Sequence, residues 1–329
     1  MTTKARTIDE YKKIAETALS NLNLRQETPH GLYEPIAYML DGGGKRLRPI
    51  LLLAVCEAAG GDITSYLPQA AGIEMYHNFT LLHDDVMDRS PLRHGKPTVH
   101  NKWDVATAIL SGDAMLTMSI QLMSKGISGE KAEDVLRVFN DTAMLVYKGQ
   151  QLDMEFESRM DVTPAEYLEM IGMKTGALLA GACRIGAILG NAEKSTGDAL
   201  YQYGMNLGIA FQIQDDLLDT YGEEKVFGKP IGGDILNDKK TWLLVEALQS
   251  KSREELIQII SDKEIQGKYK ISAVKEIYER ESLREQSTDM LNATVSKAVE
   301  CLDRVKEKIS LESYELLKNL VSGLSLRTK

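Results

Sequence analysis

Residues 73–88 read IEMYHNFTLLHDDVMD, and this stretch decides the expected fold. Its apolar side chains recur every three or four positions, which is the period of one face of an amphipathic helix; they are Ile73, Tyr76, Phe79, Leu82 and Val86. Pro91 and Gly95 interrupt the pattern soon afterwards. The stretch therefore predicts an apolar helix that ends in a run of aspartates.

The same arrangement returns further along the chain. Residues 211–219 read FQIQDDLLD, in which Ile213 and Leu217 again share one helical stripe. A Gly-Lys-Pro triplet follows each acidic run, at residues 95–97 and 228–230. The repetition indicates that one device is used twice.

Most of the remaining chain shows the same helical spacing, and strand-like alternation is scarce. Residues 163–166 are typical of a helix start, with Thr163 as the cap, Pro164 in the first turn and Glu166 completing a capping box. The segment after Lys251 is more charged and is expected to form solvent-facing scaffold helices. These features predict an all-α protein, a bundle of about ten or more helices around a deep central cavity.

Composition narrows the possible functions. No long Pro-, Gly- or Ser-rich stretch interrupts the chain, so we expect residues 1–329 to form a single domain. The net charge of −9 disfavours nucleic acid as a partner, because phosphate backbones bind clustered Lys and Arg. Three widely spaced cysteines predict neither disulfides nor a zinc site, which fits the cytoplasm. The most apolar stretch, residues 175–190, contains Arg184, so no membrane span is expected.

The two acidic runs present paired carboxylates. Residues four apart project from the same face of a helix, so Asp84 pairs with Asp88, and Asp215 with Asp219. Such pairs repel unless a cation lies between them, and Mg²⁺ is commonly held by one or two carboxylates plus substrate phosphates. A single DDxxD run is often only a solvated helix end. Two runs in matched settings predict facing clusters that bind a diphosphate through magnesium.

Residues 42–49, GGGKRLRP, carry the complementary charge. Glycine backbone beside three cations can hold phosphate oxygens through N–H groups and arginine side chains. The segment is not a Walker loop, because the GxxxxGK[ST] spacing is absent. An ordinary loop between helices is the alternative interpretation of this segment.

In combination, these motifs resemble the trans-type (E)-prenyl diphosphate synthases, over most of the chain. They occur in the family's order: GGGKRLRP at 42–49, DDVMD at 84–88 followed by Arg93, GQQLD at 149–153, Lys174-Thr175, and FQIQDDLLD at 211–219 followed by Gly228-Lys229 and Asp234. The resemblance implies the isoprenoid synthase fold, a homodimer, and a prenyltransferase that condenses isopentenyl diphosphate with an allylic diphosphate.

The resemblance also implies roles for individual residues. Three Mg²⁺ ions on the allylic diphosphate would be held by Asp84, Asp85, Asp88, Asp215 and Asp219, with Asp216 supporting the second cluster. The same diphosphate would be neutralised by Arg93, Lys174, Lys229 and Lys239. Isopentenyl diphosphate would be bound without metal by Lys45, Arg48 and His77, and the reacting carbons would lie beside Thr175 and Gln212.

The implied reaction begins when diphosphate leaves the allylic substrate, stabilised by metals and cations. The double bond of isopentenyl diphosphate then attacks the allylic cation, and the departed diphosphate is expected to accept the lost proton, because no side chain stands out as a base. The product tail would descend beside Tyr76 and Phe79. The bulk of Phe79 favours twenty carbons (geranylgeranyl diphosphate), with fifteen (farnesyl diphosphate) next; by pattern alone both residues would be ordinary core.

One position departs from the family pattern. His94 stands where the family usually has a second arginine after Arg93, at the isopentenyl diphosphate site. An imidazole donates fewer hydrogen bonds than a guanidinium and is largely neutral at cytoplasmic pH. We therefore expect weaker or pH-dependent binding of isopentenyl diphosphate, with activity retained.

Three other functions fit the sequence less well. A ferritin-like di-iron bundle would use the ExxH pattern of Glu74 and His77, but the only other match, residues 27–30, contains a proline, and such sites use Glu and His where this chain offers Asp. A terpene cyclase would share an aspartate-rich helix but would have no substrate for the basic segment around Lys45. A non-catalytic partner subunit would be expected to lack some aspartates, whereas both clusters are complete.

Overall fold

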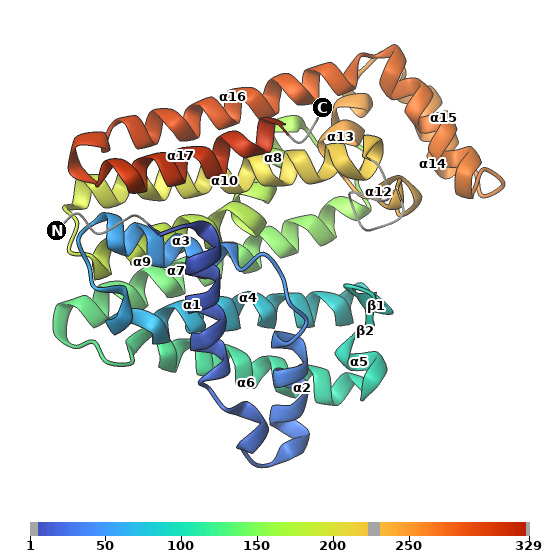
Figure 1. Cartoon of the computed structure of the whole chain (residues 1–329). Coiled ribbons are helices and arrows are strands. Elements are labelled where there is room, and N and C mark those ends of the chain that lie inside the picture. Colours follow the sequence, from blue (N-terminus) through green and yellow to red (C-terminus); the bar gives the residue numbers. More distant parts are fainter. Residues whose placement is uncertain (1–5, 223–230, 327–329) are drawn as a thin grey trace. The chain divides into compact units, whose positions relative to one another are not determined.

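The computed structural model of the protein describes residues 6–222 and 231–326 (Figure 1). The chain forms two compact units. The first comprises Met1–Asn140, Gly181–Asp198 and Glu307–Leu316, and the second comprises Asp141–Ala180, Ala199–Lys306 and Leu317–Lys329. Apart from one two-stranded hairpin, the regular structure of the described residues is helical, which confirms the all-α prediction. That the whole chain acts as one domain stays a prediction.

The first unit contains helices, two short 3-10 turns and the hairpin. Its helices are α1 (Ile8–Ser20), α2 (His30–Leu40), α3 (Leu47–Ala58), α4 (Leu67–Met87), α5 (Val99–Lys102) and α6 (Val105–Ser124). The 3-10 turns are η1 (Leu24–Gln26) and η2 (Ile63–Tyr66), and the hairpin pairs β1 (Leu92–Arg93) with β2 (Lys96–Pro97). Helix α4 packs against α6, α3 and α1, so the first acidic run lies at the end of the central helix of this unit.

The second unit contains α8 (Pro164–Ile171), the π-helical turn η3 (Gly172–Gly176), α12 (Gly233–Leu236), α13 (Trp242–Gln249), α14 (Arg253–Ser261), α15 (Gly267–Arg280) and α16 (Leu283–Asp303). Elements with residues in both units are α7 (Gly129–Glu157), α9 (Ala177–Leu189), α10 (Lys194–Tyr221), η4 (Lys306–Lys308) and α17 (Leu311–Leu326). The second acidic run occupies the last turns of α10.

The predicted helix ends are confirmed where the sequence gave a chemical signal. The hydroxyl of Thr163 accepts a hydrogen bond from the Glu166 N–H at 3.3 Å, and the Glu166 carboxylate accepts one from the Thr163 N–H at 2.8 Å. This is the predicted capping box, and α8 begins at Pro164. Helix α4 ends at Met87, before Pro91 and Gly95, which were expected to interrupt its pattern, and α10 ends at Tyr221.

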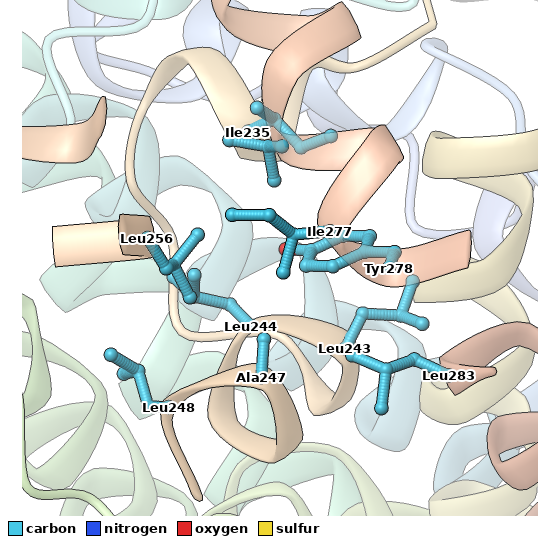
Figure 2. Close-up of a cluster of buried hydrophobic side chains, with 10 residues drawn as sticks. Ile235, Leu243, Leu244, Ala247, Leu248, Leu256, Ile277, Tyr278 and Leu283 are labelled. Atoms are coloured by element: carbon cyan, nitrogen blue, oxygen red, sulfur yellow. The ribbon is translucent and has the colours of Figure 1, made fainter. Parts of the chain in front are cut away.

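The helices after Lys251 have a buried side as well as a charged one. A cluster of apolar side chains joins α12 to α16 (Figure 2), and it comprises Ile235, Leu243, Leu244, Ala247, Leu248, Leu256, Val274, Ile277, Tyr278 and Leu283. The prediction of solvent-facing helices therefore holds for one side only, because the charge pattern hid this core.

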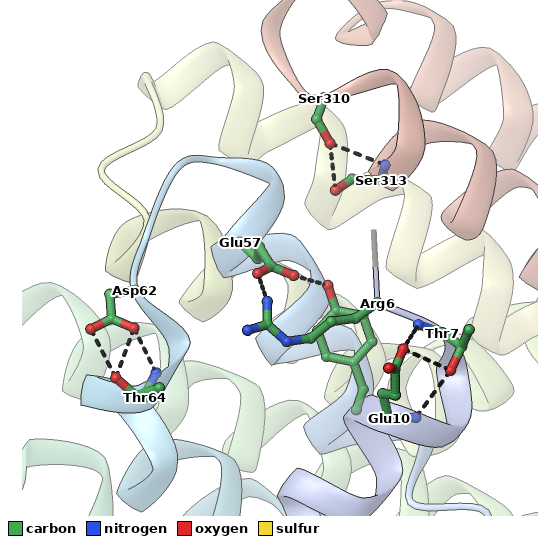
Figure 3. A network of polar contacts seen from close by, with 9 residues as sticks. Arg6, Thr7, Glu10, Glu57, Asp62, Thr64, Ser310 and Ser313 are labelled. Atoms are coloured by element: carbon green, nitrogen blue, oxygen red, sulfur yellow. Dashed lines mark hydrogen bonds and ion pairs between the residues drawn. The ribbon is translucent and has the colours of Figure 1, made fainter. Parts of the chain in front are cut away.

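The N-terminal helix is tied to the first unit by polar contacts (Figure 3). Arg6 and Tyr11 both donate to the Glu57 carboxylate on α3. Thr7 and Glu10 form a capping box at the start of α1, with the Thr7 N–H donating to Glu10 at 2.6 Å. These bonds fix α1 against α3.

Two stretches of the described residues are long and apolar enough to cross a membrane by length and composition alone, 105–124 and 164–189. In the second, 72% of the apolar window is buried inside the protein, as in the core helix of a globular protein. All three cysteines are buried and free, consistent with the expectation that no disulfide forms.

Candidate active site

The first acidic triplet lies in the last turn of α4. The Asp88 N–H donates to the Asp84 carbonyl at 2.9 Å, so the two residues are one helical turn apart, as predicted. Asp84 is half-buried and Asp88 is exposed. This end of the helix therefore presents two carboxylates on one side.

Asp85, more deeply buried than Asp84 and Asp88, points into the protein and is hydrogen-bonded there. Its side chain is 3% exposed and accepts hydrogen bonds from Arg93 Nε at 2.8 and 3.0 Å. Burial raises the pKa of Asp85, against the lowering effect of the Arg93 guanidinium. The pair fixes Arg93 beside the first triplet, where the family resemblance expected a cation.

The hairpin presents Arg93 and His94. Arg93 pairs with Lys96, leaving His94 and Gly95 as the two central turn residues, with φ of 51° and 75°. Positive φ at both positions is the requirement of a type I′ hairpin turn. Histidine is among the few side chains that tolerate it, although Gly is far more common there. The residue that departs from the family pattern is thus also in a demanding backbone position.

The three cations of GGGKRLRP have three different environments. Lys45 is exposed. Arg46 is buried, with its guanidinium 2.9 Å from the Glu74 carboxylate and donating to the Leu40 carbonyl at 2.6 Å. Arg48 has a buried Nε with no hydrogen-bond partner among the described residues. Arg46 Nε is buried without a partner in the same way, so what distinguishes Arg46 is its contact with the Glu74 carboxylate and the Leu40 carbonyl.

His77 completes a basic cluster with Arg48, Arg93 and His94. Burial lowers the pKa of His77 well below its ordinary value, and Arg48, Arg93, Arg46 and His94 lower it further. Burial also lowers the pKa of Arg48 to about 10, with Glu74 opposing. The positive charges around the neutral imidazole favour binding of an anion. The hydrogen-bond donors of these side chains are of the kind that bind a diphosphate.

The second acidic run contains one carboxylate that is fully used inside the protein. Asp216 accepts hydrogen bonds from the Tyr167 hydroxyl, from the Trp242 N–H at 2.9 Å and from Gln212 Nε2 at 3.1 Å. Burial raises its pKa to about 7, with Lys239 opposing. Gln212 in turn accepts from the Thr175 hydroxyl at 3.2 Å. The network brings together Thr175, Gln212 and Asp216, and the supporting role of Asp216 stays a prediction.

The other carboxylates of this run lie near Asp234 and Lys239. The Asp234 N–H donates to Asp219 Oδ2 at 3.0 Å, and Lys239 Nζ lies 3.7 Å from Asp234 Oδ1. Burial first, and then the charges of Asp234 and Asp215, raise the pKa of Asp219 to about 6. Burial opposes the charge on Lys239, but Asp234 and Asp216 raise its pKa above the ordinary value. Lys239 therefore neutralises the carboxylates of this cluster only in part.

Lys174 and Thr175 project from the π-helical turn η3, a kind of distortion frequent at functional sites. Lys174 forms an ion pair with Asp153 of α7. A Cβ added to Gly149 would lie 2.3 Å from the Lys174 backbone nitrogen, so only glycine allows α7 to approach the turn this closely. The GQQLD motif thus provides both the close approach and the carboxylate.

Phe79 and Tyr76 lie in an aromatic cluster inside the first unit. Both are buried, at 6% and 0% exposure. The ring of Tyr76 is 5.5 Å from that of Phe79 and 5.2 Å from that of Phe139 on α7, and Phe79 meets His83 at 4.9 Å. This packing is compatible with either interpretation of Phe79, as core or as the end of a substrate channel.

The carboxylates fit magnesium, although no cage is preformed. Across 6–222 and 231–326, no three His, Cys, Asp or Glu side chains lie together as metal ligands. Mg²⁺ shared with a diphosphate needs only one or two carboxylates, and it prefers oxygen. Asp84 with Asp88, and Asp219 crowded by other acids, offer this donor set. Lys229 and the Gly-Lys-Pro triplet at 228–230 lie outside the described residues.

Sequence reasoning missed several residues that shape the site. Asp153 and Asp234 stand inside the quoted motifs, and their position near lysines could have suggested ion pairs. Tyr167 carried no signal, and the ExxH pattern of Glu74 pointed to iron; only the packing shows that these residues bind Asp216 and Arg46. The Arg46 guanidinium binds one oxygen of the Glu74 carboxylate, the residue that the di-iron alternative would use as a ligand.

Comparisons with known proteins agree with these features. Residues 29–280 match the family model described as polyprenyl synthetase, and the chain belongs to that family. It is 44% identical over 247 residues to the geranylgeranyl diphosphate synthase of Methanosarcina mazei, covering 74% of this chain and 76% of that protein. It is 36% identical to the geranylfarnesyl diphosphate synthase of Aeropyrum pernix, covering 92% and 96%.

Solved structures give the same answer for the fold. A crystal structure of a geranylgeranyl pyrophosphate synthase is 37% identical, with a TM-score of 0.92 over 98% of this chain and 99% of that one. The geranylgeranyl pyrophosphate synthase of Corynebacterium glutamicum, solved with isoprenyl diphosphate and magnesium, is 26% identical, with a TM-score of 0.87 over 98% and 100%. The predicted family and the isoprenoid synthase fold are confirmed.

Proposed function

We propose that the protein is a magnesium-dependent trans-prenyl diphosphate synthase that adds isopentenyl diphosphate to an allylic diphosphate (dimethylallyl, geranyl or farnesyl) and makes mainly geranylgeranyl diphosphate. The observation that carries the proposal is the basic cluster of Arg48, His77, Arg93 and His94 in a member of the polyprenyl synthetase family. A terpene cyclase or a cation-binding subunit binds no second diphosphate substrate that would require such a site.

In the reaction, the C–O bond of the allylic diphosphate breaks and pyrophosphate leaves. A C–C bond forms to the terminal carbon of isopentenyl diphosphate, and one proton leaves with the pyrophosphate. Lys174 and Lys239 neutralise the departing group, and Arg93 lies beside the first triplet. The Thr175 hydroxyl donates to Gln212, and we propose that the oxygen atoms of both residues lie beside the cation.

Divalent metal would supply further charge for the leaving group. Asp84, Asp85, Asp88, Asp215 and Asp219 are the residues proposed to hold three Mg²⁺, with Asp85 limited by its bond to Arg93. Isopentenyl diphosphate is bound by Lys45, Arg48, His77 and His94. That the two acidic clusters, one in each unit, face the same diphosphate is part of this proposal.

The twenty-carbon product rests on Phe79 and on the relatives. Phe79 and Tyr76 are large, buried and in contact, which suits the end of a channel for a short product. The Methanosarcina relative is named for the twenty-carbon product, and the Aeropyrum relative for a product one isoprene unit longer. Fifteen carbons is the second choice.

We further propose a cytoplasmic homodimer. Free buried cysteines suit a reducing compartment. One side of α6 exposes large apolar residues, namely Val105, Ile109, Leu110 and Ile120. Such a patch is typical of a surface that a second copy covers.

The test is an activity assay on the purified protein. It is incubated with Mg²⁺, isopentenyl diphosphate and each allylic primer, and pyrophosphate release and product length are measured. We expect release that requires both substrates and Mg²⁺, with geranylgeranyl diphosphate as the main product. Release from an allylic diphosphate alone would indicate a cyclase, and no release would indicate a non-catalytic subunit.

A further inference from the structure

A buried lysine lies in a helix that the sequence assigned to scaffold. The Lys270 side chain, on α15, is 9% exposed, and its Nζ lies 2.7 Å from Asp238 Oδ1. A buried ammonium is tolerated only when it is paired, because desolvation of a lone charge is costly. The ion pair therefore links α15 to the segment after α12.

Asp238 occupies a conformation that needs such support. Its φ is 52°, in the left-handed region that favours glycine. The Lys240 ammonium donates to the Asp238 carbonyl at 3.3 Å and to the Glu157 carbonyl at 3.2 Å. Both neighbours of Lys239 are thus held by charged contacts.

Lys239 itself has a fixed backbone and a partly exposed side chain. Its N–H donates to the Asp234 carbonyl at 3.0 Å, and its carbonyl accepts from Thr241 at 2.8 Å. The side chain is 44% exposed and lies beside the Asp234 carboxylate, next to the second acidic run. Of residues 238–240, only Lys239 directs its charge to the site.

Helix α15 makes further contacts with the surrounding segments. A Cβ on Gly232 would lie 2.8 Å from Ile271 Cδ1, so the helix is pressed against the start of α12. Lys275 Nζ donates to the Thr220 carbonyl at 3.0 Å, one residue after Asp219. Ile277 and Tyr278 share the apolar cluster with Ile235 of α12 (Figure 2).

We propose that Lys270 is a positioning residue: through Asp238 it sets the backbone that aims Lys239 at the allylic diphosphate. The inference rests on the proposed function, since it takes Lys239 as a diphosphate ligand. It assigns a part in substrate binding to a helix outside the predicted site.

The test compares Lys270→Met, Asp238→Asn, the double variant and Lys270→Arg in the full chain. KM for farnesyl diphosphate and for isopentenyl diphosphate, kcat and the unfolding midpoint are measured for each. Lys270→Met and Asp238→Asn should each raise KM for farnesyl diphosphate about tenfold, the effect of one misplaced charged contact, and leave KM for isopentenyl diphosphate unchanged. The double variant should be no worse than either, and Lys270→Arg should stay within about threefold of the unaltered enzyme.

Arg280→Met is the matched control. Arg280 is on the same helix but pairs with Glu255 and Ser252 of the α14 region. It should lower stability without changing either KM. If Lys270→Met behaves like Arg280→Met, or raises both KM values equally, Lys270 is merely structural and the inference is overturned.

A binding measurement separates this inference from the proposed function. If the unaltered protein makes no prenyl product, the function is wrong, but the affinity for inorganic pyrophosphate with Mg²⁺ can still be titrated. That affinity should fall about tenfold in Lys270→Met and not in Arg280→Met. Equal affinity in both variants would overturn the role of Lys270.

Discussion

At the scale of single residues, burial decides which members of a charged motif reach a substrate. Lys45, Arg46 and Arg48 are equivalent in the sequence, yet Lys45 is exposed while Arg46 is buried against Glu74. Asp85 and Asp216 likewise stand in acidic runs but are hydrogen-bonded inside the protein. The sequence pattern identifies the motif, and the burial of each residue determines which of its side chains are available to a substrate.

Phe79 gives a residue-scale prediction about product length. Phe79→Ser should open the end of the channel and shift the main product to twenty-five or more carbons, read by chromatography of the dephosphorylated products. Phe156→Ser is the control, because Phe156 is also buried but lies in the second unit. Both changes should lower stability by about 3 kcal/mol or more. An unchanged product distribution in Phe79→Ser would remove Phe79 from the account.

His94 gives a residue-scale prediction about pH. A histidine gains positive charge as pH falls towards 6, so it should then bind an anion better. KM for isopentenyl diphosphate should rise about three- to tenfold from pH 6 to 8. His77 is expected to contribute little, because burial and the surrounding cations lower its pKa well below its ordinary value. His94→Arg should flatten the profile; since the substrate's own ionisation is the same for both enzymes, equal slopes would refute the role of His94.

At the scale of elements, the sequence predicted helices and their ends well, because capping boxes and apolar stripes are local signals. It did not predict the π-helical turn at Gly172–Gly176, whose shape depends on α7 packing against it. Nor did it predict that α15 would bury Lys270, because the charge of that segment conceals an apolar face. Local chemistry is readable from sequence, and pairing between distant segments is not.

The close approach at Gly149 gives an element-scale prediction. Gly149→Ala would place a methyl group 2.3 Å from the Lys174 nitrogen, so α7 and the π-helical turn must separate. We expect a loss of about 1–3 kcal/mol in unfolding free energy and a lower kcat, measured by denaturation and turnover. Gly31→Ala, in α2 with open space around it, should be neutral or slightly stabilising. Similar behaviour of the two variants would contradict the packing argument.

At the scale of the whole molecule, the chain's two units each carry one acidic run, and the proposed homodimer is expected to form through α6. Leu110→Glu should convert the dimer to monomer in light scattering, because Leu110 is 60% exposed on the apolar side of that helix. Leu311→Glu, with the same exposure on α17, should leave the mass unchanged. A dimer that survives Leu110→Glu would place the interface elsewhere.

The central claim is that the two acidic runs bind one diphosphate together through divalent metal. The most direct measurement is the number of Mn²⁺ ions bound per chain. It is obtained from the electron paramagnetic resonance signal of free Mn²⁺, with and without an unreactive thio-analogue of farnesyl diphosphate. We predict three ions that bind only when the analogue is present, and their joint loss in both Asp84→Asn and Asp215→Asn. Metal binding that ignores the analogue, or that each substitution reduces independently of the other run, would contradict the account.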